Sequence, residues 1–287
     1  MNLRVESLPP GWYPRNPDEI RRFLTGLSGK GSGGKALAAL APHAGWYYSG
    51  KIAAAAVSAL DPETETLVIF GGHLPRGMSP LFAEEDGVRT PLGPVAIDGE
   101  LRDAVRKEIP GREDRFRDNT VEVLLPMVRF YLPRTKILWL RLPAEESSFE
   151  AGRIVAKVLG SLGRRGAVLG STDLTHYGEN YGFTPQGRGL AALKWVREVN
   201  DRGFIGAVDA GDPLAVLSHA ERNGSACSAG AVLGVLGYAG AVKAGPARLL
   251  RYGTSADVRG TPVSDDEVES FVGYAALGWY AAGDSYS

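Results

Sequence analysis

Apolar positions along the chain fall into short β-rich runs that alternate with longer stretches at helical spacing. A short apolar run bounded by turn residues favours a buried strand, whereas apolar residues at every third or fourth position favour an amphipathic helix. On this basis we expect strands at Ala36–Ala41, Leu67–Phe70, Lys136–Leu142, Ala167–Gly170, Arg248–Tyr252 and Phe271–Leu277. The alternation predicts an α/β fold with a central, mostly parallel sheet flanked by helices.

The stretches between the strands predict helices at Ser49–Leu60, Leu101–Ile109, Thr120–Tyr131, Ser148–Leu162, Leu190–Ala207, Pro213–Glu221 and Ser228–Val242. Ser49 is a candidate N-cap. Pro126 predicts a kink or an early end of its helix, because proline lacks a backbone donor. The last helix is rich in small residues and is expected to pack tightly inside. We find no linker that would split the chain, so we expect one domain over residues 1–287, with Gly29–Gly34 as a surface loop.

Composition narrows the class of protein. The chain carries 32 Lys plus Arg and 33 Asp plus Glu, a formal charge of -1, which argues against nucleic-acid binding by bulk electrostatics. A single cysteine cannot form an intramolecular disulfide and is typical of a reducing compartment. The most hydrophobic long stretch, Ser228–Val242, is shorter than the roughly 20 residues that a spanning helix needs. We therefore expect a cytoplasmic protein that does not bind membranes.

Three of the four histidines lie in segments that follow predicted strands: His43, His73 and His176. Ligands of open parallel sheets bind beyond the carboxyl ends of the strands, where loops converge on a rigid frame. We therefore expect these three imidazoles on one rim of the sheet. Asp173, three residues before His176, either orients that ring or caps a turn. The fourth histidine, His219, is interpreted as structural or solvent-facing.

Other residues fit both a functional and a structural interpretation. Cys227 lies in a small-residue turn before a predicted helix, whose free N–H groups favour the thiolate, the form that binds metal or attacks. A buried, inert thiol is the alternative. Glu122 fits the third position of a helix that Asn119 would cap. The run Trp46-Tyr47-Tyr48 suits either core packing or the wall of a pocket.

One block of the sequence, Ala41-Pro42-His43-Ala44-Gly45-Trp46-Tyr47-Tyr48-Ser49-Gly50, closely resembles the signature loop of the Memo family (mediator of cell motility). Prokaryotic members of that family include the AmmeMemoRadiSam system protein B group. Further matching blocks follow in order along nearly the whole chain, among them Arg89-Thr90-Pro91-Leu92-Gly93, Ser171-Thr172-Asp173-Leu174-Thr175-His176 and Tyr252-Gly253-Thr254-Ser255. The Memo fold is in turn similar to that of the class III extradiol dioxygenases, which use non-heme Fe(II).

This resemblance implies a metal site with three ligands: His43, His73 and Cys227. Fe(II) is the expected metal, and the thiolate is also compatible with Cu or Zn. The resemblance further implies His176 as an acid/base with Asp173 as its companion, and we take Glu122 as the third catalytic candidate. It implies a small-molecule or peptide substrate, and the family name implies a radical SAM protein and an AMMECR-type protein as partners.

Two departures from the family pattern bear on proton transfer and substrate fit more than on metal binding. Asn119 stands where the family has a histidine, and Gly71-Gly72-His73 shortens a Gly-Pro-x-His loop. The leading hypothesis is a metal-dependent, dioxygenase-like redox enzyme. The alternatives are a hydrolase in which Cys227 is the nucleophile and His176 the base, and a non-catalytic module that binds a peptide or a metal.

Overall fold

The computed structural model describes residues 2–27, 35–258, 264–265 and 268–283, and within them the chain forms one large mixed sheet. Its strands, in spatial order, are β10 (His176–Gly178), β12 (Ser270–Trp279), β2 (Ala38–Ala41), β9 (Gly166–Ser171), β3 (Thr66–Leu74), β8 (Lys136–Pro143), β4 (Leu81–Phe82) and β7 (Arg112–Glu113), and β11 (Arg248–Thr254) pairs with β12. The four neighbours β2, β9, β3 and β8 run parallel. Antiparallel pairs join β12 to β2, β10 and β11, and β4 to β8. The predicted α/β fold is confirmed, with a sheet that is parallel at its centre, antiparallel on either side of that centre, and parallel again between β4 and β7 at one edge.

The remaining elements are a small sheet and the helices. The small sheet consists of β1 (Leu3–Arg4), β5 (Gly87–Val88) and β6 (Val95–Ala96). The α-helices are α1 (Pro17–Thr25), α2 (Trp46–Ala59), α3 (Gly99–Glu108), α4 (Asn119–Glu122), α5 (Leu125–Tyr131), α6 (Ser147–Ser161), α7 (Gly189–Trp195), α8 (Asp201–Asp209), α9 (Pro213–Asn223) and α10 (Ala229–Ala241). Among the helices that the structure describes, we find none with both the length and the apolar character to cross a membrane.

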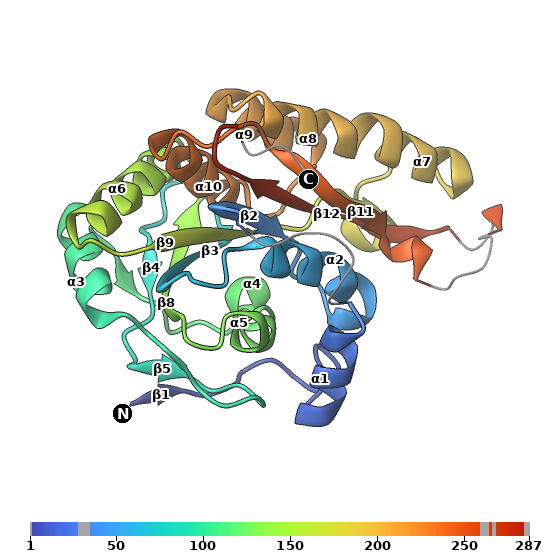
Figure 1. The fold of residues 1–287 in the computed structure, drawn as a ribbon. Helices are drawn as coiled ribbons and strands as arrows, with labels where there is room; N and C mark the ends of the chain where they lie inside the picture. The colour runs from blue at the N-terminus through green and yellow to red at the C-terminus, as the bar shows by residue number, and fades with distance from the viewer. Residues whose placement is uncertain (1, 28–34, 259–263, 266–267, 284–287) are drawn as a thin grey trace.

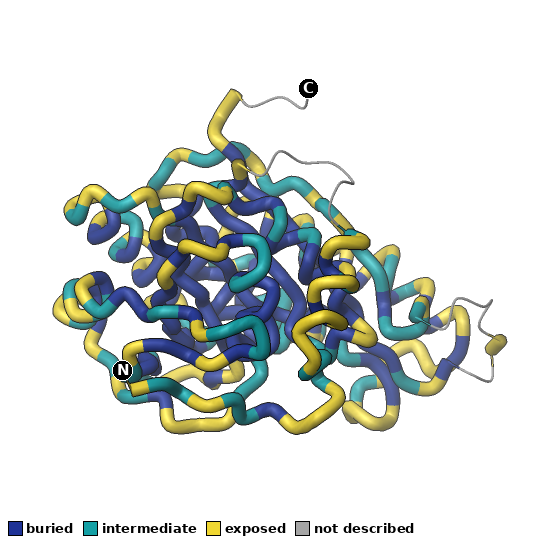
Figure 2. Tube along the Cα trace, turned by 60° about the horizontal axis from the view of Figure 1, so that its bottom comes forward, coloured by how far each residue is buried: buried dark blue, intermediate teal, exposed yellow. Residues whose placement is uncertain are grey.

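Helices cover both faces of the large sheet (Figure 1). Successive strand residues point to opposite faces, so Ile69 and Trp139 pack with α1, α2 and α5, whereas Val68 and Leu138 pack with α3, α6, α8 and α10. Both sets are buried, which explains why the central strands are nearly continuous apolar runs. Figure 2 shows the buried residues gathered in the middle of the molecule and the exposed ones on its outer turns. The small-residue helix α10 is buried along most of its length, as predicted.

The structure corrects the predicted start of one helix and divides another. Helix α2 starts at Trp46 with Gly45 as its N-cap, so the prediction of Ser49 as the cap is wrong. Ser49 lies inside the helix, where its hydroxyl donates to the Ala44 carbonyl at 3.0 Å. The predicted helix 120–131 divides into α4 and α5, and Pro126 lies in the first turn of α5. Pro126 tolerates that position because the first turn needs no donor from it, and the expected interruption is confirmed.

The predicted helix 190–207 consists of three consecutive helical segments: α7, the π-helix η2 (Val196–Asn200) and α8. The π-turn lies directly before α8, and Asn200 and Asp201 are both buried there. Wide helical turns of this kind are frequent beside functional sites. The glycine-rich stretch 29–34 lies outside the described residues.

Candidate metal centre

The candidate ligands gather at the carboxyl ends of the central parallel strands. His43 follows β2, Asp173 follows β9, and His73 lies on β3. The sequence placed His73 in a loop after Phe70, but β3 continues to Leu74 with an irregular register against β8 between Gly71 and Leu74. Cys227 does not come from the sheet but lies on the turn between α9 and α10. The sheet therefore supplies two imidazoles and a helix junction supplies the sulfur.

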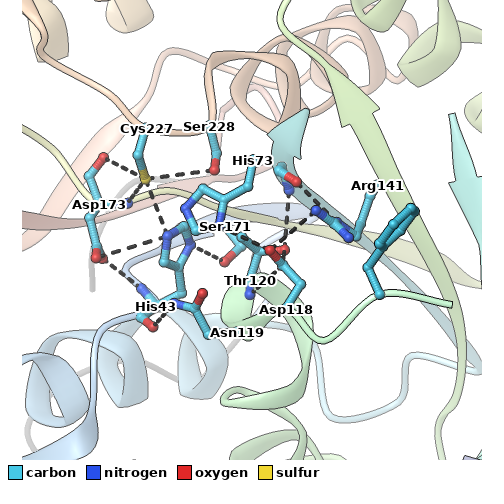
Figure 3. A network of polar contacts seen from close by, with 12 residues as sticks. His43, His73, Asp118, Asn119, Thr120, Arg141, Ser171, Asp173, Cys227 and Ser228 are labelled. Carbon is cyan, nitrogen blue, oxygen red and sulfur yellow. Dashed lines mark hydrogen bonds and ion pairs between the residues drawn. The ribbon is translucent and has the colours of Figure 1, made fainter. Parts of the chain in front are cut away.

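Three side chains meet closely enough to share one ion (Figure 3). His43, His73 and Cys227 each offer one ligand atom, and these atoms lie within 4.8 Å of one another. The Cys227 Sγ atom is 3.2 Å from His43 Nε2. The two imidazole rings meet edge to face, with centroids 4.8 Å apart. This is the ligand set that the family resemblance implied.

Each imidazole is held through its other nitrogen. His43 Nδ1 lies 2.8 Å from the Ser171 hydroxyl oxygen, and His73 Nδ1 lies 3.0 Å from Asp118 Oδ2. Metal-binding histidines usually donate their second ring N–H to such a partner, which fixes the tautomer and leaves Nε2 free for the metal. Two imidazoles and one sulfur with this support therefore fit a divalent transition metal.

The backbone at β3 is shaped around this cluster. His73 has a φ of 56°, a left-handed conformation that residues other than glycine rarely adopt. A side chain at Gly72 would collide with Ser228, so the glycine lets the turn that carries Cys227 approach the strand. Strained backbone of this kind persists where the surrounding structure holds it in place, commonly at functional sites.

The environment of Cys227 favours the thiolate. Burial alone would raise the pKa of the thiol, but the His43 and His73 imidazoles beside it lower that pKa well below its usual value. The Asp173 backbone N–H also donates to the sulfur at 3.3 Å. The thiolate is the form that binds metals and attacks electrophiles. These surroundings favour the reactive interpretation of Cys227 over that of an inert buried thiol.

The pKa values of both imidazoles and of the neighbouring Asp173 carboxyl are raised, for different physical reasons. Burial lowers the pKa of His73, but Asp118 and Cys227 outweigh it and raise that pKa to about 10. The pKa of His43 is also raised, because Cys227 and Asp173 oppose the effect of its burial. Burial raises the pKa of Asp173, and the neighbouring His43 opposes that rise only in part. Opposite charges thus stabilise one another inside this cluster.

A cavity of about 830 Å³ opens beside the cluster, and His43, His73, His176 and Asp173 all line it. His176 Nδ1 lies 3.1 Å from the Leu174 carbonyl, and its ring meets Tyr181 edge to face. Asp173 Oδ1 accepts the His43 backbone N–H at 2.7 Å. The three histidines that the sequence predicted on one rim therefore face one cavity.

Other predicted residues divide between this cavity and other parts of the fold. Tyr47 and Tyr48 line the cavity and are exposed, whereas Trp46 is buried in the core, so both interpretations of that aromatic run hold in part. Asn119 lines the cavity, and its side-chain amide donates to the His43 carbonyl at 2.9 Å. Asn119 is not the N-cap of α4, because Asp118 takes that position and accepts the Thr120 N–H at 2.8 Å.

Glu122 lies apart from the three ligands, among residues of the N-terminal segment. Its carboxylate accepts the backbone N–H groups of Ser7 and Leu8 and the Tyr13 hydroxyl. It is not among the residues that line the cavity. The structure therefore brings together five of the six predicted site residues. His219 lies on α9, with Nδ1 2.7 Å from the Ser225 hydroxyl oxygen.

Residues that support the site were missed by the sequence analysis. Ser171 and Asp118 hold the imidazoles, Arg141 contacts Asp118, and Asp201 supports the segment before His176. One clue was available: Arg141 is a charged residue near the end of a predicted strand that is otherwise apolar after Lys136. A charge buried in such a strand needs a partner, and that partner commonly belongs to a site.

The chain resembles one protein family and members of that family along nearly its whole length. The family model described as "Memo-like protein" matches residues 4–278. A MEMO1 family protein of Methanosarcina mazei is 29% identical, covering 96% of this chain and 99% of its own length. One of Methanothermobacter thermautotrophicus is 30% identical with the same coverage. Among solved structures, an uncharacterized protein from Escherichia coli K12 superimposes with a TM-score of 0.47 at 13% identity, covering 83% of this chain and 99% of that chain. The match to the family model spans nearly the whole sequence, and the chain belongs to the Memo family.

Proposed function

We propose that this Memo-family protein is a metal-dependent redox enzyme of the dioxygenase type, in which His43, His73 and Cys227 hold Fe(II). The observation that carries the proposal is a thiol with a lowered pKa beside two imidazoles whose Nδ1 atoms are engaged by Ser171 and Asp118. Two imidazoles and one thiolate suit Fe(II), and Cu and Zn are the alternatives for a ligand set that contains sulfur.

Bound at these residues, Fe(II) would supply electrons and a common binding point for O₂ and a small-molecule or peptide substrate. A dioxygenase places both atoms of O₂ in its product, so the reaction needs no further reductant. The chain itself contributes binding and proton transfer. Its cavity of about 830 Å³ holds the substrate beside Tyr48 and Tyr181, and His176 gives or takes a proton at a substrate hydroxyl.

Metal analysis of protein purified without oxygen tests the site. We expect about one iron per chain in the wild type and a large loss in His43→Ala and Cys227→Ala, since each removes one ligand. His219→Ala is the matched control, because His219 is the histidine that lies outside the cavity lining. Equal iron content in all four proteins would overturn the proposed site.

A hydrolase with Cys227 as nucleophile is the second candidate, and the lowered pKa of the thiol favours it. The contacts around the sulfur favour ligation instead, because its imidazole neighbour is His43 at 3.2 Å, whereas His176 Nδ1 faces the Leu174 carbonyl. Alkylation by iodoacetamide separates the two functions. Rapid alkylation that added Fe(II) or Zn(II) does not slow would support the hydrolase, and protection by metal would support the metal site.

Oxygen consumption separates catalysis from binding alone. We expect the iron-loaded protein to consume O₂ when a catechol is added, and His176→Ala to consume it more slowly while it retains its iron. Iron binding without O₂ consumption with any catechol or dithiol would favour the non-catalytic module that binds a peptide or a metal. A radical SAM protein and an AMMECR-type protein as partners remain a prediction from the family name.

A further inference from the structure

The two imidazoles of the candidate metal site are supported unequally. Ser171 offers His43 a neutral hydroxyl, whereas Asp118 offers His73 a carboxylate. Hydrogen bonds to a charged partner are about twice as strong as those between neutral groups. The geometry of His73 therefore depends on what keeps the Asp118 carboxylate in place.

Arg141, on β8, forms an ion pair with Asp118 (Figure 3). Its Nη2 atom lies 3.2 Å from Asp118 Oδ2, the same oxygen that faces His73 Nδ1. Its Nη1 atom lies 3.3 Å from Asp114 Oδ1, and its Nε–H donates to the Gly72 carbonyl at 3.0 Å. Every nitrogen of the guanidinium thus has a partner, and two of these partners adjoin His73.

These ion pairs are buried, and a second arginine, Arg4, faces the same Asp114 carboxylate as Arg141. The side chain of Arg141 is 4% exposed and that of Asp114 is 0% exposed. Arg4 on β1 approaches the same Asp114 carboxylate at 4.0 Å and is 12% exposed. Arg4 has hydrogen bonds to the carbonyls of Asp114 and Phe116, but its contacts do not include Asp118 or His73. The two arginines therefore share one acidic partner, and Arg141 is the one that adjoins the site.

We propose that Arg141 is a positioning residue of the metal site. The planar guanidinium fixes Asp118 Oδ2 and the Gly72 carbonyl at the same time. These two contacts keep the His73 ring turned toward Cys227, although the His73 backbone has a φ of 56°. A lysine keeps the charge but offers a single nitrogen that cannot reach three acceptors in one plane, so it cannot replace the arginine here. The inference rests on the proposed metal site and is independent of the redox reaction.

Binding of Co(II), used alone as the probe, tests the role of Arg141. The variant is Arg141→Lys, and the matched control is Arg4→Lys, which makes the same change on the other arginine that faces Asp114. We expect Arg141→Lys to bind Co(II) about 10-fold or more weakly, the loss typical of a group that orients a ligand. We expect Arg4→Lys to bind like the wild type. The sulfur-to-cobalt absorption band, which reports the Cys227 bond, should persist at saturating Co(II) in both variants.

The outcomes distinguish this inference from the metal site itself. Arg141→Lys with wild-type affinity for Co(II) overturns the role of Arg141, while loss of binding in Cys227→Ala still supports the site. Equal binding by the wild type and Cys227→Ala overturns the site. Thermal unfolding of each metal-free protein shows that the variants are folded. If Arg141→Lys does not fold, Asp118→Asn takes its place, since it keeps an acceptor for His73 and removes the ion pair; unchanged affinity in that variant also overturns the inference.

Discussion

Two carboxylates support different parts of the candidate site, and their pKa values shift in opposite directions. Burial would raise the pKa of Asp118, but His73 and Arg141 lower it to about 2. Burial raises the pKa of Asp201 to about 6, against the hydrogen bonds from Thr175 and Tyr252. Asp201 is fully buried and Asp118 only partly so, which contributes to the difference, and the partners of each carboxylate contribute the rest. A cationic partner preserves the ionised form, and neutral donors do so only in part.

Asp118 and Asp201 also differ in the residues that they contact. Asp118 belongs to a cluster of ion pairs behind a proposed metal ligand. Asp201 accepts the Thr175 N–H at 3.1 Å and the Tyr252 hydroxyl at 2.7 Å, and so secures the segment directly before His176. The His73 side of the candidate site is therefore organised by charge, and the His176 side by neutral hydrogen bonds. Each of the following substitutions tests one side of that comparison.

Arg141→Met should have the largest effect, because it leaves the carboxylates of Asp114 and Asp118 buried without their shared cation. We expect the free energy of unfolding of the metal-free protein to fall by about 3–5 kcal/mol, measured by urea denaturation. Arg134→Met is the control, since Arg134 pairs with Glu63 at the surface and should cost about 1 kcal/mol or less. A loss no greater than that of the control would show that charge does not organise the His73 side of the site.

Asp201→Asn should change how stability depends on pH. The pKa of Asp201 is raised from 3.8 to about 6, so between these values the folded protein binds more protons than the unfolded chain. The free energy of unfolding therefore falls as pH rises through this interval, by an amount on the order of 3 kcal/mol. Asparagine stays neutral, and its oxygen can accept from Thr175 while its amide donates to the Tyr252 hydroxyl.

The difference in unfolding free energy between Asp201→Asn and the wild type should accordingly grow in favour of the variant from pH 4 to about pH 7. Urea denaturation across that range measures it. Asp209→Asn removes an exposed charge from the same helix, α8, and is the control for charge alone. A difference that is constant with pH would show that Asp201 is already ionised in the folded protein at the lower end of the range.

Much of the fold and of the candidate ligand set could be predicted from the sequence because the relevant pattern is local. The apolar runs at Lys136–Leu142 and Phe271–Leu277 became β8 and β12 with small changes at their ends. His43 and His73 stand beside strand ends, and Cys227 stands beside a helix start, so their neighbours in the chain already indicated where they lie. The resemblance to the Memo family predicted that the side chains of these three residues lie together.

The supporting residues could not be predicted in this way because their partners are set by the topology. Arg141 faces Gly71 only because β8 lies beside β3 in the sheet. Asp201 reaches Thr175 across 26 positions of sequence, from the end of a π-turn that the helical pattern at Leu190–Ala207 did not reveal. Glu122 illustrates the reverse case, since a carboxylate in a family-like block accepts hydrogen bonds from the N-terminal segment and not from the cavity residues.

Gly273→Ala tests how closely β12 approaches Asp201 on the His176 side of the site. A side chain at Gly273 would collide with the Asp201 carboxylate, and Gly273 also exchanges backbone hydrogen bonds with the segment before His176. We expect a loss of about 1–3 kcal/mol in the free energy of unfolding, as for other overpacked sites. Gly253→Ala on the neighbouring β11 is the control, because its new methyl group would meet the flexible end of Ile52.

The collision between a side chain at Gly273 and Asp201 also predicts that the effects of Gly273→Ala and Asp201→Ala on stability are not additive. Combining Gly273→Ala with Asp201→Ala removes the obstructing carboxylate, so the double variant should be more stable than the sum of the single losses indicates. Additive losses would show that the strain at Gly273 comes from the backbone and not from Asp201.

Ser171→Ala should have the smallest effect and compares the two imidazoles directly. The hydroxyl that faces His43 Nδ1 at 2.8 Å is neutral, and a hydrogen bond of that kind contributes about 1 kcal/mol. Its loss should weaken Co(II) binding by roughly 5-fold, since 1.4 kcal/mol corresponds to a factor of about 10. Asp118→Asn on the other imidazole should weaken binding by about 10-fold or more, because a charged partner is lost there. Equal losses in the two variants would mean that both imidazoles need only a fixed tautomer, and that the charge behind His73 serves the stability of the fold.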